Sequence, residues 1–175
     1  MAKVKQLIIL AGGRGTRLKH ETDYTPKPLV QLFDGKCILG LLIDKYMKEF
    51  SEILIFAGYK SEKIDSFINE NYQNKNIHVL TEDVPSGTAG ALKLHKDKLD
   101  SSFAVINGDT WFESDVSISS LDLGSSIAGL VLTKIKDASR YGSVKVSTSG
   151  KVEAFLEKGK QNNNKMDHRR TWQHR

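Results

Sequence analysis

A chain of 175 residues is long enough to bury a hydrophobic core as one domain. Hydrophobic residues make up 39% and charged residues 27%, as in ordinary globular proteins, and no apolar run approaches the length that spans a bilayer. The N-terminus lacks the apolar stretch of a signal peptide, so we expect a cytoplasmic protein without membrane contacts. The single cysteine, Cys37, excludes an internal disulfide and is expected to be a small buried hydrophobe.

The net charge of +5 is unevenly distributed. Residues 160–175 carry five cations and one anion, a net +4, which leaves about +1 for the rest of the chain. A nearly neutral body argues against nucleic-acid binding. RNA binding through the basic tail stays open as an alternative. It is a weak one, because Trp172 is the tail's single aromatic residue and does not make a stacking surface.

Strand and helix patterns alternate over the first 109 residues. Short apolar runs predict strands, and apolar residues at helical spacing predict helices. Ser61 is expected to be the N-cap of the helix over 61–72. This alternation predicts an α/β fold with a Rossmann-like, doubly wound, mostly parallel sheet and helices on both faces. The expected strands cover 6–10, 53–57, 77–80 and 103–106, and the expected helices cover 38–50, 61–72 and 88–99.

The pattern changes after residue 115. Strands are expected over 127–134, 143–147 and 151–156, with a hairpin turn at 147–150. Residues 160–175 have no apolar period and are expected to be a disordered polar, basic tail. The predicted organisation is therefore a domain over 1–159 followed by this tail.

The loop from Leu10 to Leu18 is rich in glycine and carries Arg14 and Arg17. Glycines let the backbone approach a ligand closely, successive N–H groups form an anion site, and arginine suits phosphate. The dinucleotide fingerprint fails because Leu18 stands where its third glycine belongs, and no P-loop spacing is present. We interpret the loop as a phosphate site, the alternative being an ordinary glycine-rich turn.

Three shorter motifs could serve the same chemistry. In Pro26-Lys27-Pro28 two prolines fix the backbone of one lysine, which could be aimed at a phosphate or belong to a rigid surface turn. In Asn107-Gly108-Asp109 a carboxylate after a buried strand could hold Mg²⁺ or cap a turn. In residues 86–91 small residues could receive a flat base, although a helix start capped by Ser86 or Thr88 explains them equally well.

Taken in order, these motifs resemble the family of nucleotidyltransferases that act on sugar 1-phosphates. The resemblance runs from about residue 5 to residue 159 and is most similar to the branch of D-glycero-D-manno-heptose 1-phosphate guanylyltransferases. The matching segments are 10–18, 26–28, 87–91, 107–109, 140–142 and 155–158.

The resemblance implies an enzyme that joins an NTP, with GTP favoured, to a sugar 1-phosphate, with heptose or mannose 1-phosphate favoured, and releases pyrophosphate. It assigns Arg17, Lys27 and Asp109 to catalysis, and Asp109 also to the Mg²⁺ cofactor. The implied sugar-phosphate residues are Tyr141, Gly142, Glu157 and Lys158. The implied nucleotide-binding residues are Leu10, Ala11, Gly12, Gly13, Gly15, Thr16, Gly87, Thr88 and Gly108.

The chain departs from the family beyond Lys158, where members continue into further strands and helices. We therefore expect a fold that is incomplete at its C-terminal end, through truncation or a reading-frame change. A nucleotide-binding remnant without turnover is the alternative function. The expected partners are the NTP and the sugar 1-phosphate, without nucleic acid or membrane, and a homo-oligomer stays open. The implied role is synthesis of nucleotide sugars for lipopolysaccharide or capsule.

Overall fold

The computed structural model describes residues 3–13, 24–32, 34–73, 75–82, 87–111, 117–133, 142–156 and 171–173. The chain divides into two compact units, residues 1–122 and 123–175.

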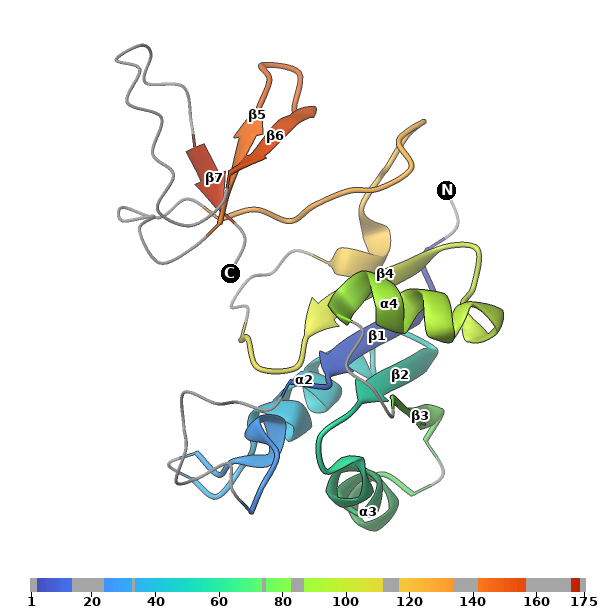
Figure 1. Ribbon diagram of the computed structural model, residues 1–175. Coiled ribbons are helices and arrows are strands. Elements are labelled where there is room, and N and C mark those ends of the chain that lie inside the picture. Colours follow the sequence, from blue (N-terminus) through green and yellow to red (C-terminus); the bar gives the residue numbers. More distant parts are fainter. Residues whose placement is uncertain are drawn as a thin grey trace. The chain divides into compact units, whose positions relative to one another are not determined.

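The first unit is built on a four-stranded parallel sheet. The strands are β1 (Gln6–Ala11), β2 (Glu52–Ala57), β3 (Ile77–Thr81) and β4 (Phe103–Asn107). Their order across the sheet is β3-β2-β1-β4, as Figure 1 shows. All three pairings are parallel, so the strand ends Ala11, Ala57, Thr81 and Asn107 share one edge. The predicted doubly wound parallel sheet is thereby confirmed.

Helices cover both faces of this sheet. Alternate residues of a strand point to opposite faces, so Leu7 and Ile9 enter one core and Ile8 enters the other. The first core is closed by α2 (Ile38–Tyr46) and α3 (Ser61–Asn71). The second is closed by α4 (Gly87–Leu94), which lies beside the sheet in Figure 1. Ala91 of this helix belongs to a buried cluster with Phe56 and Leu54. Burial on both faces explains why the strands are continuous apolar runs.

The helix boundaries differ from the prediction in all three helices. Helix α2 ends at Tyr46 rather than at residue 50, although the chain turns so that Phe50 is still buried and its N–H bonds the Tyr46 carbonyl. Ser61 is not the N-cap of α3, because Lys60 takes that position with a left-handed φ of 56° and no side-chain cap. Helix α4 starts at Gly87, so Thr88 lies within it.

Helix α4 is also shorter than the predicted helix over 88–99. It ends at Leu94, and a 3-10 helix, η3 (Lys96–Lys98), follows it. Leu99 is extended, which redirects the chain into β4. A further 3-10 helix, η4 (Ile118–Ser120), lies near the end of the first unit, and a 3.0 Å hydrogen bond from the Val4 N–H to the Ser119 carbonyl connects it to the start of the chain.

The second unit contains a three-stranded antiparallel sheet. It is formed by β5 (Ser143–Val146), β6 (Val152–Leu156) and β7 (Thr171–Gln173), in the order β6-β5-β7. The predicted hairpin turn is confirmed: the Ser147 N–H bonds the Lys151 carbonyl at 2.8 Å, and Gly150 has a φ of +83°.

Two predictions for this unit are not met. The expected strand over 127–134 is wrong for residues 127–133, which form no strand, although Thr133 makes a β-bridge and Ile127 is fully exposed. Residue 134 lies outside the described part. In the tail, expected to lack regular structure, Thr171–Gln173 form β7 because the free edge of β5 offers them backbone partners. Within the described residues, no helix has the length and apolar character needed to cross a membrane.

Candidate functional site

The predicted site lies at the carboxyl edge of the parallel sheet, where the strand order reverses. The chain passes from β1 to β2 and β3 on one side and then returns to place β4 on the other side of β1. Such a reversal leaves a crevice between the two neighbouring strand ends, and open α/β sheets bind ligands there. Gly12 and Gly13 follow β1, and Gly108 and Asp109 follow β4, so the loops after these two strands share one edge of the sheet.

The glycines after β1 serve close backbone approach rather than an unusual φ. Neither Gly12 nor Gly13 has a positive φ. A Cβ atom on the neighbouring Gly58 would lie 3.1 Å from the carbonyl oxygen of Gly12, so the chain segments leaving β1 and β2 are nearly in contact. Gly13 is exposed at this edge. Its backbone is therefore available to a ligand, as the phosphate-site interpretation requires.

Lys27 is held by the two prolines as predicted. The 3-10 helix η2 (Lys27–Leu29) begins after Pro26, and the side chains of Pro26 and Pro28 are both buried. A 2.8 Å hydrogen bond from the Leu29 N–H to the Pro26 carbonyl closes the turn. The rigid turn fixes the point from which the flexible lysine side chain extends.

Lys27 reaches Asp109, 82 residues further along the chain. Its Nζ lies 2.6 Å from Oδ2 of Asp109, and the two side chains are 37% and 40% exposed. The other carboxylate oxygen, Oδ1, accepts a 3.1 Å hydrogen bond from the hydroxyl of Thr110. The structure thus joins two of the three residues predicted to be catalytic.

Asp109 is an ionised carboxylate in this setting. Partial burial alone raises the pKa of its carboxyl group, but the hydrogen bond and the charge of Lys27, with the Thr110 hydroxyl, outweigh burial and hold the pKa below its usual range. At neutral pH the pair is therefore an ammonium facing a carboxylate.

The donor set at this edge suits Mg²⁺ that is shared with a substrate. Within the described part of the chain, no three His, Cys, Asp or Glu side chains gather into a metal cluster. Mg²⁺ usually takes only one or two carboxylates and completes its shell with water and substrate phosphates. Asp109 supplies one such carboxylate, so the residues present fit a nucleotide-bound Mg²⁺ rather than a cage made by the protein alone.

The predicted base-binding segment begins α4. Gly87 has a φ of +70° and Thr88 is exposed, whereas Ala91, one turn later, is only 2% exposed and packs against the sheet. The small side chain of Ala91 therefore lets the helix approach the sheet closely. Contact of Gly87 and Thr88 with a base stays a prediction.

Glu82 belongs to the same edge and was missed by the sequence reasoning. It follows β3 directly, and its N–H donates a 2.8 Å hydrogen bond to the carbonyl of Ala57 at the end of β2. A Cβ atom built on Gly12 would lie 3.7 Å from its Oε1, so the carboxylate extends across the end of β2 toward β1. An acidic residue directly after a predicted strand was the available signal.

Of the predicted sugar-phosphate residues, the structure describes Gly142 alone. It belongs to the second unit, just before β5, where an added Cβ would lie 3.5 Å from the Leu156 carbonyl oxygen. The predicted site residues that lie outside the described part are Gly15, Thr16, Arg17, Tyr141, Glu157 and Lys158. Lys27, Asp109 and the glycines that follow β1 and β4 are thus described, whereas most of the predicted sugar-phosphate residues lie outside the described part.

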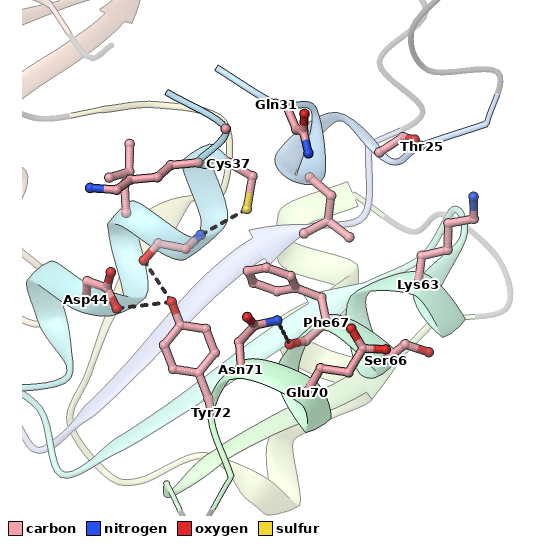
Figure 2. Close-up of a pocket in the computed structure, with 15 residues that line it drawn as sticks. Thr25, Gln31, Cys37, Asp44, Lys63, Ser66, Phe67, Glu70, Asn71 and Tyr72 are labelled. Carbon is pink, nitrogen blue, oxygen red and sulfur yellow. Dashed lines mark hydrogen bonds between the residues drawn. The ribbon is translucent and has the colours of Figure 1, made fainter. Parts of the chain in front are cut away.

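A separate groove of about 550 Å³ lies between α2, α3 and the segment 25–37 (Figure 2). None of the predicted site residues that the structure describes lines it. The Tyr72 hydroxyl lies 3.0 Å from Oδ1 of Asp44 and 3.2 Å from the carbonyl oxygen of Gly40, as the dashed lines show. Burial, together with the hydrogen bond and charge of Asp44, raises the pKa of Tyr72 well above its usual range.

Cys37 also borders this groove and caps α2. Its Sγ accepts a hydrogen bond from the Gly40 N–H at 3.4 Å, and the residue is 8% exposed. Burial raises the pKa of the thiol, which stays protonated at neutral pH. The prediction of a small buried side chain rather than a reactive thiol is confirmed.

Comparison with known proteins agrees with this geometry. The family model "Nucleotidyl transferase" matches residues 6–168. The D-glycero-alpha-D-manno-heptose 1-phosphate guanylyltransferase of Campylobacter jejuni is 35% identical over 87% of this chain and 68% of its own length. The bifunctional protein GlmU of Methanococcus maripaludis is 33% identical over 87% of this chain, which spans 35% of that protein.

A solved structure shows the same fold. HddC from Yersinia pseudotuberculosis, complexed with GMP-PN, superposes with a TM-score of 0.71 at 32% identity, covering 97% of this chain and 73% of HddC. The strand order, the glycines at the ends of β1 and β4 and the paired Lys27 and Asp109 thus occur in a chain whose sequence and fold match one family. The chain belongs to the nucleotidyl transferase family, where it groups with the enzymes that use sugar 1-phosphates.

Proposed function

We propose that the chain transfers a nucleoside monophosphate from an NTP, preferably GTP, to a sugar 1-phosphate, with heptose or mannose 1-phosphate as the preferred acceptor. The observation that carries this proposal is the Lys27–Asp109 pair at the strand-order reversal, 2.6 Å apart. An ammonium and a carboxylate at this edge combine a group that binds phosphate with one that binds Mg²⁺.

The reaction needs two anions to approach one another. An oxygen of the sugar phosphate attacks the α-phosphorus of the NTP, a new P–O bond forms, and the bond to the β-phosphate breaks so that pyrophosphate leaves. The protein positions the reactants and neutralises their charge. Mg²⁺, when bound, withdraws charge from the phosphate oxygens.

Each residue of the proposed site then has a defined role. Gly12 and Gly13 line the triphosphate with their backbone, Lys27 contacts phosphate at the reacting centre, and Asp109 holds Mg²⁺. Arg17 holds the leaving pyrophosphate. The acceptor residues follow from the resemblance alone: Tyr141, Gly142, Glu157 and Lys158.

Two observations support guanine as the base. The C. jejuni relative is a guanylyltransferase by name, and the HddC structure holds GMP-PN. The carboxylate of Glu82 adds a chemical reason, because guanine presents N–H donors at N1 and N2 and a carboxylate only accepts. Adenine lacks this pair of donors. The proposed setting is cytoplasmic synthesis of nucleotide sugars for lipopolysaccharide or capsule.

Pyrophosphate release tests the proposal. The assay contains Mg²⁺, GTP, and heptose or mannose 1-phosphate, and compares the natural chain with Asp109→Asn. We expect a loss of roughly a hundredfold or more in rate, because one group that stabilises charge in the transition state is removed. Asp65→Asn is the matched control, since Asp65 is an exposed carboxylate on α3, remote in sequence from the proposed site.

GTP binding measured by calorimetry separates the two candidate functions. Binding together with release that depends on Asp109 supports the transferase. Binding without release from any NTP would contradict turnover and leave a nucleotide-binding protein.

A further inference from the structure

Both oxygens of the Asp109 carboxylate are engaged by the protein itself. Oδ2 faces the Lys27 ammonium at 2.6 Å, and Oδ1 accepts from the Thr110 hydroxyl at 3.1 Å. The Lys27 ammonium already balances the negative charge of Asp109, so a divalent cation that binds this carboxylate would stand beside a second positive charge. The ammonium and the cation therefore compete for one carboxylate.

The Lys27–Asp109 contact is built so that it can be exchanged. Its two side chains are 37% and 40% exposed. Separating them therefore creates neither a buried cavity nor a buried unpaired charge. Pro26 and Pro28 hold the backbone of Lys27, which leaves its four-carbon side chain as the part that can move. Exposed ion pairs of this kind are weak and readily replaced.

We propose that Lys27 is a placeholder for the divalent cation. In the free protein its ammonium neutralises Asp109, and when the cation binds Asp109 the ammonium leaves this carboxylate and pairs with the nucleotide phosphates. This inference rests on the proposed function for the identity of the anion that receives Lys27. Because the triphosphate draws the ammonium away from Asp109, nucleotide binding strengthens cation binding. By thermodynamic reciprocity, the cation strengthens nucleotide binding by the same factor.

Mn²⁺ binding in the absence of nucleotide tests the exchange. Free Mn²⁺ is measured by electron paramagnetic resonance while the ion is titrated into the natural chain and into Lys27→Met. We expect Lys27→Met to bind Mn²⁺ roughly five- to tenfold more tightly, a coupling of ordinary size, because its Asp109 has no competing ammonium. Lys27→Met/Asp109→Asn is expected to lose this gain.

Lys36→Met is the matched control for the loss of one positive charge. Lys36 pairs with Asp34 at 3.7 Å, and both side chains are exposed. Its removal is expected to leave Mn²⁺ affinity at Asp109 unchanged. If Lys27→Met fails to fold by circular dichroism, Lys27→Gln provides the same neutral side chain with polar character.

The outcomes are distinct. Tighter Mn²⁺ binding in Lys27→Met but not in Lys36→Met supports the placeholder. Mn²⁺ affinity that Lys27→Met leaves unchanged or weakens overturns it. The titration uses neither nucleotide nor acceptor, so a failure of pyrophosphate release in the activity assay would refute the proposed transferase without moving this result.

Discussion

The amide nitrogen of Gly108 donates a 2.8 Å hydrogen bond to the carbonyl oxygen of Leu10. The same proximity leaves no room for a side chain, because a Cβ atom on Gly108 would lie 2.9 Å from that oxygen and 3.2 Å from Cγ2 of Ile9. Gly108 does not have a positive φ, so what the position requires is space. This contact ties the end of β4 to β1 directly before Asp109.

Gly108→Ala is therefore expected to destabilise the fold by about 1–3 kcal/mol, the usual cost of forcing a methyl group into a packed site. The displaced β4 end would also move Asp109 from Lys27, so the rate of pyrophosphate release should fall. Urea unfolding followed by circular dichroism measures the first effect.

Gly13→Ala is the control for that substitution. Among the described residues, no atom lies within 4 Å of a Cβ built on Gly13, and its φ is not positive. Its stability should stay within about 0.5 kcal/mol of the natural chain. Equal stability of the two variants would contradict the steric argument.

Much of the first unit was predictable because a doubly covered parallel sheet requires apolar strands. The runs ending at Leu10 and Ile106 are bounded by glycine turns, and their parallel pairing follows from the intervening helices. The apolar run from Ile127 carries the same signal, yet residues 127–133 form no strand and Ile127 is fully exposed. Composition records the apolar character of a segment, whereas pairing depends on which other segments are present.

The candidate site was predictable in its residue types but not in its contacts. Prolines beside Lys27 and glycine before Asp109 mark two constrained positions, yet nothing in the sequence measures the distance between positions 82 residues apart. Glu82 was missed because an acid after a strand is common in loops. Its place at the candidate site follows from its closeness to Gly12, and this closeness is visible only once the order of the strands in the sheet is known.

Glu82→Gln tests whether this carboxylate recognises guanine. Glutamine has a similar size but replaces one acceptor oxygen with an NH₂ donor, which would face the donors of guanine. We expect GTP affinity to fall roughly tenfold or more, because a hydrogen bond to a charged group is lost and an unpaired donor is introduced, whereas ATP affinity should change little.

The matched control for base recognition is Glu70→Gln, an exposed carboxylate on α3. Calorimetric titration with GTP and ATP gives both affinities. An equal loss for the two nucleotides would argue for a general effect on the fold or the charge, and no loss for either would remove Glu82 from the proposed base site.

Tyr72→Phe tests the hydrogen bonds that join α2 to the end of α3. The variant keeps the ring, which packs edge-on against Phe67, and removes the hydroxyl that lies 3.0 Å from Asp44 and 3.2 Å from the Gly40 carbonyl oxygen. The free energy of unfolding should fall by about 1 kcal/mol at pH 7.

The same substitution should flatten the alkaline limb of the stability profile. Burial, with the hydrogen bond and charge of Asp44, raises the pKa of Tyr72 in the folded chain, whereas an unfolded tyrosine has a pKa of about 10. Since the folded chain holds this proton more tightly, the stabilisation is fully present below about pH 10 and is lost as pH rises toward the folded pKa. The natural chain should therefore lose stability above pH 10 more steeply than Tyr72→Phe.

Cys37 and Tyr46 contribute to the same alkaline limb in both chains, since burial also raises the pKa of each group. The charge of Cys37 is one cause of the raised pKa of Tyr72, so the difference in slope reports the Tyr72 hydroxyl together with its coupling to Cys37. Urea midpoints from pH 8 to pH 11 measure it, with Tyr24→Phe as the control because that side chain is 78% exposed. Parallel pH profiles for the natural chain and Tyr72→Phe would show that the hydroxyl does not couple α2 to α3.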